Sequence, residues 1–146
     1  MIKITKEDFN VEEEIKKMLE KHKNIGGVVT FVGVVRNVGI KDGEEKEVEK
    51  LEFECYEKMA IKKLEEIREE AMKKYDIIDA IIIHRIGTLK VGEKIVLIAV
   101  GAKHRKDAFL ACEYLIDELK KVVPIWKKEY AKDGSYWVEY SGSTTK

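Results

Sequence analysis

The feature that most constrains the fold is a proline that interrupts an apolar and basic stretch near the C-terminus. Pro124 is the single proline among the 146 residues. It lacks a backbone N–H and clashes with a preceding helical turn, so it ends a helix and biases Val123 toward extended geometry. The 3–4 spacing of apolar residues before it predicts a helix over about 106–122. Residues 125–130 and 136–140 flank a Lys-Asp-Gly-Ser sequence and predict a closing hairpin.

The rest of the chain contains short β-branched runs and two further amphipathic patterns. Strands often follow strands directly, so the predicted order β-α-β-β-α-β-β-α-β-β is not a strict βα alternation. We therefore expect one α+β domain over residues 1–146, with helices packed on a mixed or antiparallel sheet. Segment 37–47 is polar, contains two glycines and predicts a mobile loop. The further predicted strands are 1–5, 26–36, 48–56 (with one slip of alternation at Lys50–Leu51), 77–86 and 95–102, and the predicted helices are 58–75 and one capped by Asp8 or Asn10 that ends near residue 23.

Charge and cysteine content narrow the class of protein. The 28 basic residues balance 28 acidic residues, so no global positive field attracts nucleic acid, and any cation cluster acts locally. Cys55 and Cys112 lie on apolar faces of their predicted elements and fit a reducing compartment. No apolar run is long enough to span a bilayer, and the N-terminus does not resemble a signal peptide. The three histidines lack ligand spacing. We expect a cytoplasmic protein with no metal, no cofactor and no membrane or nucleic-acid partner.

Two lysines on either side of the proline are the first candidates for chemistry. Lys120 precedes Pro124 and Lys127 follows it, and the turn fixed by the proline sets the direction of one lysine relative to the other. Closely placed ammonium groups lower each other's pKa, which makes one of them a usable acid or base near neutral pH. Lysine is also common at helix C-termini, where it complements the helix dipole, so spacing alone leaves a structural role open.

Three further cations occur where an anion could bind. His104 and Arg105 come where a strand meets the N-terminus of the last predicted helix, an end that exposes free N–H groups. Arg36 ends the glycine-containing strand and can bind a carboxylate or phosphate through two hydrogen bonds. Each of these residues is equally compatible with a solvated cap or strand end. A second pair, His84 and Arg85, has no accompanying cation cluster and is interpreted as structural.

The length of the last predicted helix separates these candidates. From His104 to Lys120 the helix extends roughly 24 Å at about 1.5 Å per residue, so the two side chains cannot meet at one small substrate within one chain. Either only one of them is functional, or the site is shared between two chains. We favour a homodimer whose composite site takes Lys120 and Lys127 from one protomer and His104 and Arg105 from the other.

Three runs of sequence carry a resemblance to a known family. They are TFVGVVRN, HRIGTLKVGEKIVLIAVGAKHRKDAF and LKKVVPIWKKE, and they resemble the molybdopterin synthase large, catalytic subunit from Ile2 to about Tyr140. That family converts cyclic pyranopterin monophosphate to molybdopterin by inserting the two sulfurs of the dithiolene. The resemblance implies a small ubiquitin-like partner subunit that ends in Gly-Gly and supplies sulfur as a C-terminal thiocarboxylate. It also implies a heterotetramer, with a central homodimer and one small subunit at each end.

The resemblance also implies roles for individual residues. Some family members carry an arginine shortly after the closing Trp-Val-Glu, where this chain has Tyr140 and Ser141, so that cation contact is missing or supplied elsewhere. Matching motifs identify Lys120 and Lys127 as the family's essential lysines, Arg36, His104 and Arg105 as its substrate-anion site, and Phe31 and Ile116 as part of the pocket for the partner's tail.

Two other functions remain compatible with the sequence. A non-catalytic scaffold would bind a ubiquitin-like partner without depending on Lys120 or Lys127. An anion or RNA binder would show a steep salt dependence, although the balanced charge argues against it. The lysine pair around Pro124 favours an enzyme that transfers sulfur from the thiocarboxylate to the pterin.

Overall fold

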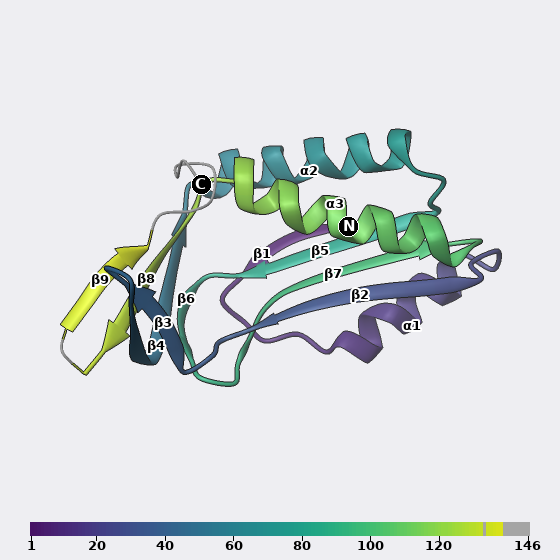
Figure 1. Ribbon diagram of the computed structural model, residues 1–146. Coiled ribbons are helices and arrows are strands. Elements are labelled where there is room, and N and C mark those ends of the chain that lie inside the picture. Colours follow the sequence, from purple (N-terminus) through teal and green to yellow (C-terminus); the bar gives the residue numbers. More distant parts are fainter. Residues whose placement is uncertain (133, 139–146) are drawn as a thin grey trace.

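In the computed structural model, which describes residues 1–132 and 134–138, the chain forms two β-sheets that meet at one end of the molecule (Figure 1). The described ranges contain three helices and nine strands in the order β-α-β-β-β-α-β-β-β-α-β-β. The predicted α+β class is confirmed. None of the helices in these ranges is long and apolar enough to cross a bilayer.

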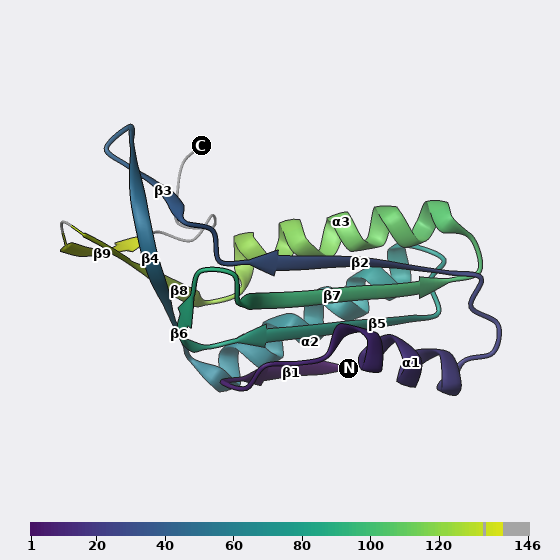
Figure 2. The same ribbon diagram turned by 90° about the horizontal axis from the view of Figure 1, so that it is seen from below.

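The first sheet has four strands in the order β1-β5-β7-β2, which Figure 2 shows side by side. β1 runs parallel to β5 and the other neighbours are antiparallel, as expected for a mixed sheet. β5 lies in the interior because its side chains are largely apolar on both faces, and all seven of its residues are buried. The strands are β1 (Ile2–Thr5), β2 (Gly27–Val34), β5 (Asp79–Arg85) and β7 (Lys94–Ala102).

Helices cover both faces of this sheet (Figure 1). α1 (Val11–Lys21) lies on one face and begins after Asn10, whose side-chain oxygen accepts a hydrogen bond from the N–H of Glu13 at 2.9 Å. α2 (Glu57–Lys74) and α3 (Arg105–Val122) lie on the opposite face. The C-terminal end of α3 points toward the second sheet, and its N-terminal end lies at the far end of the molecule (Figure 1).

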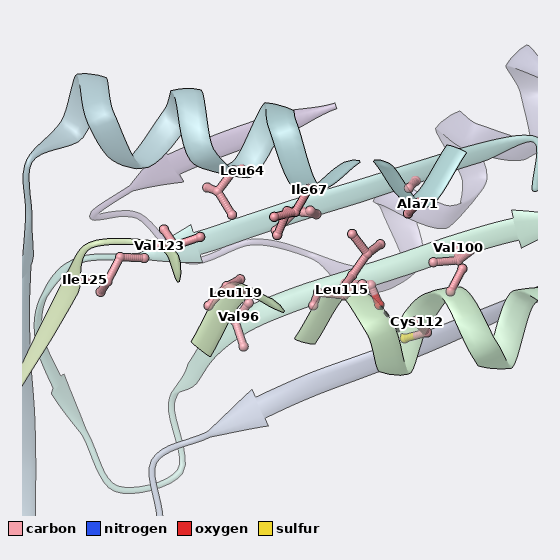
Figure 3. Packing of buried hydrophobic residues seen from close by; sticks show 14 of the residues in the cluster. Leu64, Ile67, Ala71, Val96, Val100, Cys112, Leu115, Leu119, Val123 and Ile125 are labelled. Carbon is pink, nitrogen blue, oxygen red and sulfur yellow. Dashed lines mark hydrogen bonds between the residues drawn. The ribbon is translucent and has the colours of Figure 1, made fainter. Parts of the chain in front are cut away.

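The main core lies between α2, α3 and the first sheet (Figure 3). Leu64 and Leu115 are fully buried there, one from each helix. Small residues let the two helices approach the sheet and each other closely. These are Ala60, Ala71, Ala108 and Ala111, all with no exposed surface.

Truncating Leu115 tests this core. We expect Leu115→Ala to lower the free energy of unfolding by about 2–5 kcal/mol, because the surrounding helices close only part of the cavity that it leaves. Chemical denaturation measures the change. Leu19→Ala is the matched control, since Leu19 is 40% exposed and its loss is expected to cost about 0.5 kcal/mol or less. Equal losses in the two variants would contradict the assignment of Leu115 to the core.

The second sheet is antiparallel and has the order β3-β4-β8-β9, with β6 paired to β4. β4 carries a bulge between Val48 and Lys50, at the place where the sequence alternation slips. The bulge returns Leu51 and Phe53 to the buried face of the strand. The strands are β3 (Val38–Lys41), β4 (Glu44–Cys55), β6 (Gly87–Lys90), β8 (Ile125–Ala131) and β9 (Gly134–Val138).

Two segments predicted as loops contain strands. β3 and the start of β4 form a hairpin within 37–47, so the predicted loop there was wrong; its mobility stays a prediction. Asp42 and Gly43 form the turn with φ values of 53° and 78°, which suits an Asp-Gly hairpin turn. The predominantly charged run over 41–47 masked the strand pattern, because the outward-facing side chains of the hairpin meet water. β6 likewise lies within the predicted connector 87–94. The sequence predicted a single sheet. The structure has two sheets, and these two strands belong to the second.

The predicted closing hairpin is present as β8 and β9. β9 begins earlier than predicted, at Gly134 instead of Tyr136. Positions 139 and 140 of the predicted strand lie outside the described residues, and so does the departure from the family pattern at Tyr140 and Ser141.

Candidate functional site

A cavity of about 500 Å³ lies where the two sheets meet the C-terminal end of α3. Its wall comes mainly from β2, β4, β7, β8 and the last turns of α3, and most of its side chains are apolar, for example Leu51, Phe53 and Val96. A mostly apolar cavity with a few charged groups is typical of small-molecule sites. The charged residues in its wall are Arg36, Lys120, Lys127 and Glu129.

Most of the predicted site residues line this one cavity. They come from three separate stretches of the chain: the end of β2 and the residues after it, the C-terminal half of α3, and β8. His104 and Arg105 do not line it, because they lie at the N-terminal end of α3. One chain therefore brings together Phe31, Arg36, Ile116, Lys120 and Lys127 and leaves out His104 and Arg105.

Pro124 explains how the two lysines reach the same cavity. α3 ends at Val122, and the N–H of Val123 still donates to the carbonyl of Leu119 at 3.2 Å. The chain then enters β8, in which Lys127 lies opposite Phe53 of β4 and Val138 of β9. The helix end thus supplies one lysine and the strand supplies the other.

Alternation along β8 turns Lys127 toward the cavity and its two neighbours away from it. Trp126 packs edge-to-face on Tyr56, with ring centroids 5.2 Å apart. The ammonium of Lys128 lies 5.4 Å from the centroid of the Trp137 ring. Neither Trp126 nor Lys128 lines the cavity, so the period of two in a strand separates the cavity-facing side of β8 from its outer side.

The surroundings of Lys127 alter its acidity. Burial lowers the pKa of Lys127 below its usual value, and the nearby charges of Lys120 and Arg36 lower it further. Glu129 acts in the opposite direction and raises this pKa. Because burial outweighs the carboxylate, the ammonium gives up its proton more readily than an exposed lysine does. A partly buried lysine with a lowered pKa is a candidate for proton transfer.

Glu129 is a site residue that the sequence reasoning missed. It is only 6% exposed, and its Oε2 lies 3.8 Å from the Nζ of Lys127. A buried carboxylate needs partners, and here it has the lysine and the hydroxyl of Tyr136, which donates to Oε1 at 2.6 Å. Its position two residues after Lys127 on a predicted strand was the available signal, because residues i and i+2 share a face.

Removing the charge of Glu129 tests its effect on the lysine. We expect Glu129→Gln to move the titration of Lys127 to lower pH, because the amide no longer favours the charged ammonium. NMR of labelled lysine side chains measures this titration, with the signal assigned from a Lys127→Arg variant. Glu118→Gln is the control, since Glu118 pairs with Lys121 at 3.9 Å and does not line the cavity. An unchanged Lys127 titration in Glu129→Gln would contradict the coupling.

His84 and Arg85, interpreted as structural from the sequence, have different surroundings. The Arg85 guanidinium pairs with Glu93 at 3.2 Å and donates to the carbonyls of Lys6 and Lys94, which is a structural role. His84 lies in the cavity wall with its ring edge-to-face on Phe53. Burial lowers the pKa of His84 to about 4, so the ring is neutral near pH 7. A neutral ring donates from Nδ1 to the carbonyl of Arg85 at 2.7 Å.

Comparison with known proteins identifies the family. Residues 4–122 match the family described as MoaE protein. A molybdopterin synthase catalytic subunit from Pyrococcus abyssi is 48% identical over 133 residues, covering 91% of this chain and 86% of that relative. Molybdopterin synthase from Staphylococcus aureus superposes with a TM-score of 0.83 at 41% identity, covering 92% of this chain and 94% of that one. A complex of subunits 1 and 2 of molybdopterin-converting factor from Helicobacter pylori gives a TM-score of 0.73 at 25% identity, with coverage of 99% and 92%.

The fold and these similarities define an enzyme of molybdenum cofactor biosynthesis. The chain belongs to the MoaE protein family and resembles the catalytic subunits of molybdopterin synthase over nearly its whole length. Its role is sulfur transfer. The family and function predicted from the sequence are thereby confirmed.

Proposed function

We propose that the cavity at the junction of the two sheets is where sulfur passes from the thiocarboxylate of a small ubiquitin-like subunit to cyclic pyranopterin monophosphate. The observation that carries this proposal is the convergence of Arg36, Lys120 and Lys127 on one cavity with otherwise mostly apolar walls. Both reactants are anions, and cations suit both of them. The mostly apolar wall reduces screening by water around the half-buried Lys127 and strengthens its charge interactions more than those of Arg36 and Lys120, which are exposed.

The three cations have different tasks in this proposal. Lys120 and Lys127 stabilise the charge that develops on the thiocarboxylate carbonyl while its sulfur attacks the pterin side chain. Lys127 also transfers protons, since its lowered pKa makes the ammonium a better proton donor than that of an exposed lysine. Arg36 binds the pterin phosphate through charge-assisted hydrogen bonds.

The partner's tail enters past an apolar rim. Phe31 lines the cavity and is 37% exposed, and Ile116 lies in the same wall on α3. An extended tail that ends in two glycines is thin enough to pass between such side chains. The Helicobacter pylori relative was solved as a complex of two different subunits, which supports a small partner for this chain as well.

A second copy of the chain completes the site. α3 places His104 and Arg105 at the end of the helix that is remote from Lys120, so these residues serve the cavity of the neighbouring protomer in a homodimer. With one small subunit at each end, the assembly is a heterotetramer. We also propose a cytoplasmic location, supported by Cys55 and Cys112, which are both free thiols.

Reconstitution tests the function. The purified chain is mixed with a thiocarboxylated small subunit and cyclic pyranopterin monophosphate, and the dithiolene product is detected by fluorescence after oxidation. Product that depends on both partners is expected. A stable complex with the small subunit but no product would favour a non-catalytic scaffold, and neither complex nor product would contradict the proposal.

A further inference from the structure

The Glu129 carboxylate is held by a cross-strand neighbour. Tyr136 of β9 lies directly opposite Glu129 of β8 in the strand pairing, where side chains on one face are in contact range. Its hydroxyl donates to Oε1 at 2.6 Å, while Oε2 faces the ammonium of Lys127 at 3.8 Å. The two oxygens of one carboxylate therefore have different partners. A hydroxyl donor that keeps Oε1 engaged limits rotation of the carboxylate and leaves Oε2 directed at the lysine.

The hairpin of β3 and β4 packs behind the same carboxylate. A methyl group added at Gly39 of β3 would collide with Oε1 of Glu129, so the glycine allows the backbone to lie against this oxygen. The ammonium of Lys41, two residues along β3, lies 4.2 Å from the centroid of the Tyr136 ring, within range of a cation–π contact. β3 and β9 are the two ends of the four-strand path in the second sheet, and both reach Glu129 because the sheet curls.

We propose that Tyr136 is a positioning residue of the sulfur-transfer site, because its hydroxyl orients Glu129 toward Lys127. β3 packs behind the carboxylate through Gly39 and Lys41. This inference rests on the proposed role of Lys127 in proton transfer. Tyrosine suits the task because it donates a hydrogen bond without adding a positive charge. The full negative charge of Glu129 then acts on Lys127, which a cationic donor in the same place would partly cancel.

Other charged groups also surround the pair of Glu129 and Lys127, and any change in the Lys127 titration must be judged against them. Alternation along β4 puts Lys46 on the same face as the buried Val48. The surrounding titratable or charged groups come from the segment after β2 and from β3, β4, β5 and α3, and are Arg36, Lys41, Lys46, His84 and Lys120.

Tyr136→Phe removes the hydroxyl and keeps the ring that contacts Lys41. We expect the Lys127 titration to move to lower pH, in the direction of Glu129→Gln but by less, because the carboxylate remains but loses its orientation. In the reconstituted reaction, kcat at neutral pH should fall about fivefold with KM little changed, a loss typical of one hydrogen bond. The alkaline limb of the rate profile should move to lower pH together with the titration.

Tyr130→Phe is the matched control. The Tyr130 hydroxyl also donates to a glutamate of the second sheet, Glu52, at 2.7 Å, but neither residue lines the cavity. This variant should leave both the Lys127 titration and kcat unchanged. Gly39→Ala is a second test that leaves Tyr136 in place, since the added methyl group displaces Oε1 of Glu129 and should move the titration in the same direction as Tyr136→Phe.

A double variant distinguishes positioning from a general structural effect. If Tyr136 acts through Glu129, Tyr136→Phe causes no further shift of the Lys127 titration in a Glu129→Gln background. An additional shift of equal size there, or no shift from Tyr136→Phe alone, would overturn the proposal. The NMR titration needs no substrate. It therefore tests the contact even if reconstitution yields no product, and that result would count against the proposed function and not against the positioning.

Discussion

Replacing Lys127 by alanine is expected to abolish dithiolene formation while the fold remains intact. The ammonium lies in the cavity beside Glu129, and the charges of Lys120 and Arg36 act on it. In the proposed mechanism, its removal takes away both a positive charge near the reacting carbonyl and a proton donor, each worth about 10²- to 10⁴-fold in rate. The fluorescence assay for the oxidised product measures the loss, and the thermal unfolding midpoint reports on the fold.

The neighbouring lysine provides the control for this experiment. Lys128→Ala removes the same charge one residue further along β8, but Lys128 lies over Tyr130 and Trp137 outside the cavity. It should retain nearly full activity. Lys127→Arg restores the charge, but the guanidinium stays protonated and cannot transfer a proton, so it should recover little of the rate. A Lys127→Ala enzyme that turns over normally would remove the lysine from the mechanism.

Mixing two inactive variants is expected to restore activity. Lys120→Ala and His104→Ala each disable every site of their own homodimers if the site takes these residues from different protomers. After equal mixing and exchange of subunits, half of the dimers are hybrids, and each hybrid contains one site with both residues intact. About one quarter of all sites should therefore be active in the mixture.

Two features make the hybrid experiment decisive. The helix separation of roughly 24 Å between the two positions prevents one chain from supplying both residues to one cavity. A mixture of Lys120→Ala with Lys127→Ala, which remove residues of the same cavity, must stay inactive even though its chains exchange equally well. Recovery in that control would point to contamination or refolding. No recovery with the His104→Ala partner would contradict the composite site.

The sequence predicted the fold most accurately where burial imposes a clear period. The helix ending before Pro124 and the buried strands β5 and β7 were found within a few residues of their bounds. β3 was missed because its neighbours in sequence are charged, and one face of an outer strand carries little apolar signal. The turn at Asp42 and Gly43 was the local pattern that could have revealed it.

The candidate site was predicted from residue types. The prediction was incomplete where other cavity residues come from strands that are distant in sequence. Lys120 and Lys127 were predicted together because they are near each other in sequence, and both line the cavity. Their joint access to one cavity also depends on the antiparallel pairing of β4 with β8, which no local sequence pattern encodes. His84 was assigned a structural role because no cation cluster accompanies it in the sequence, and its place in the cavity wall beside Phe53 of the other sheet appears only in the fold. Glu129 was not predicted, although side-chain alternation two positions after Lys127 was a signal that could have indicated it.

The convergence of Arg36, Lys120 and Lys127 also affects which ligands the cavity selects. Backbone hydrogen bonds at the end of α3 and along β8 fix the backbone positions of the two lysines, and both side chains line the same cavity, so their like charges act on each other. Their mutual repulsion is part of the energy of the folded protein before any ligand arrives. A dianionic ligand relieves that repulsion when it binds, whereas an uncharged pterin of the same shape leaves it in place. In the proposed function, a preference for the phosphorylated substrate therefore follows from a repulsion that is already present in the unliganded chain.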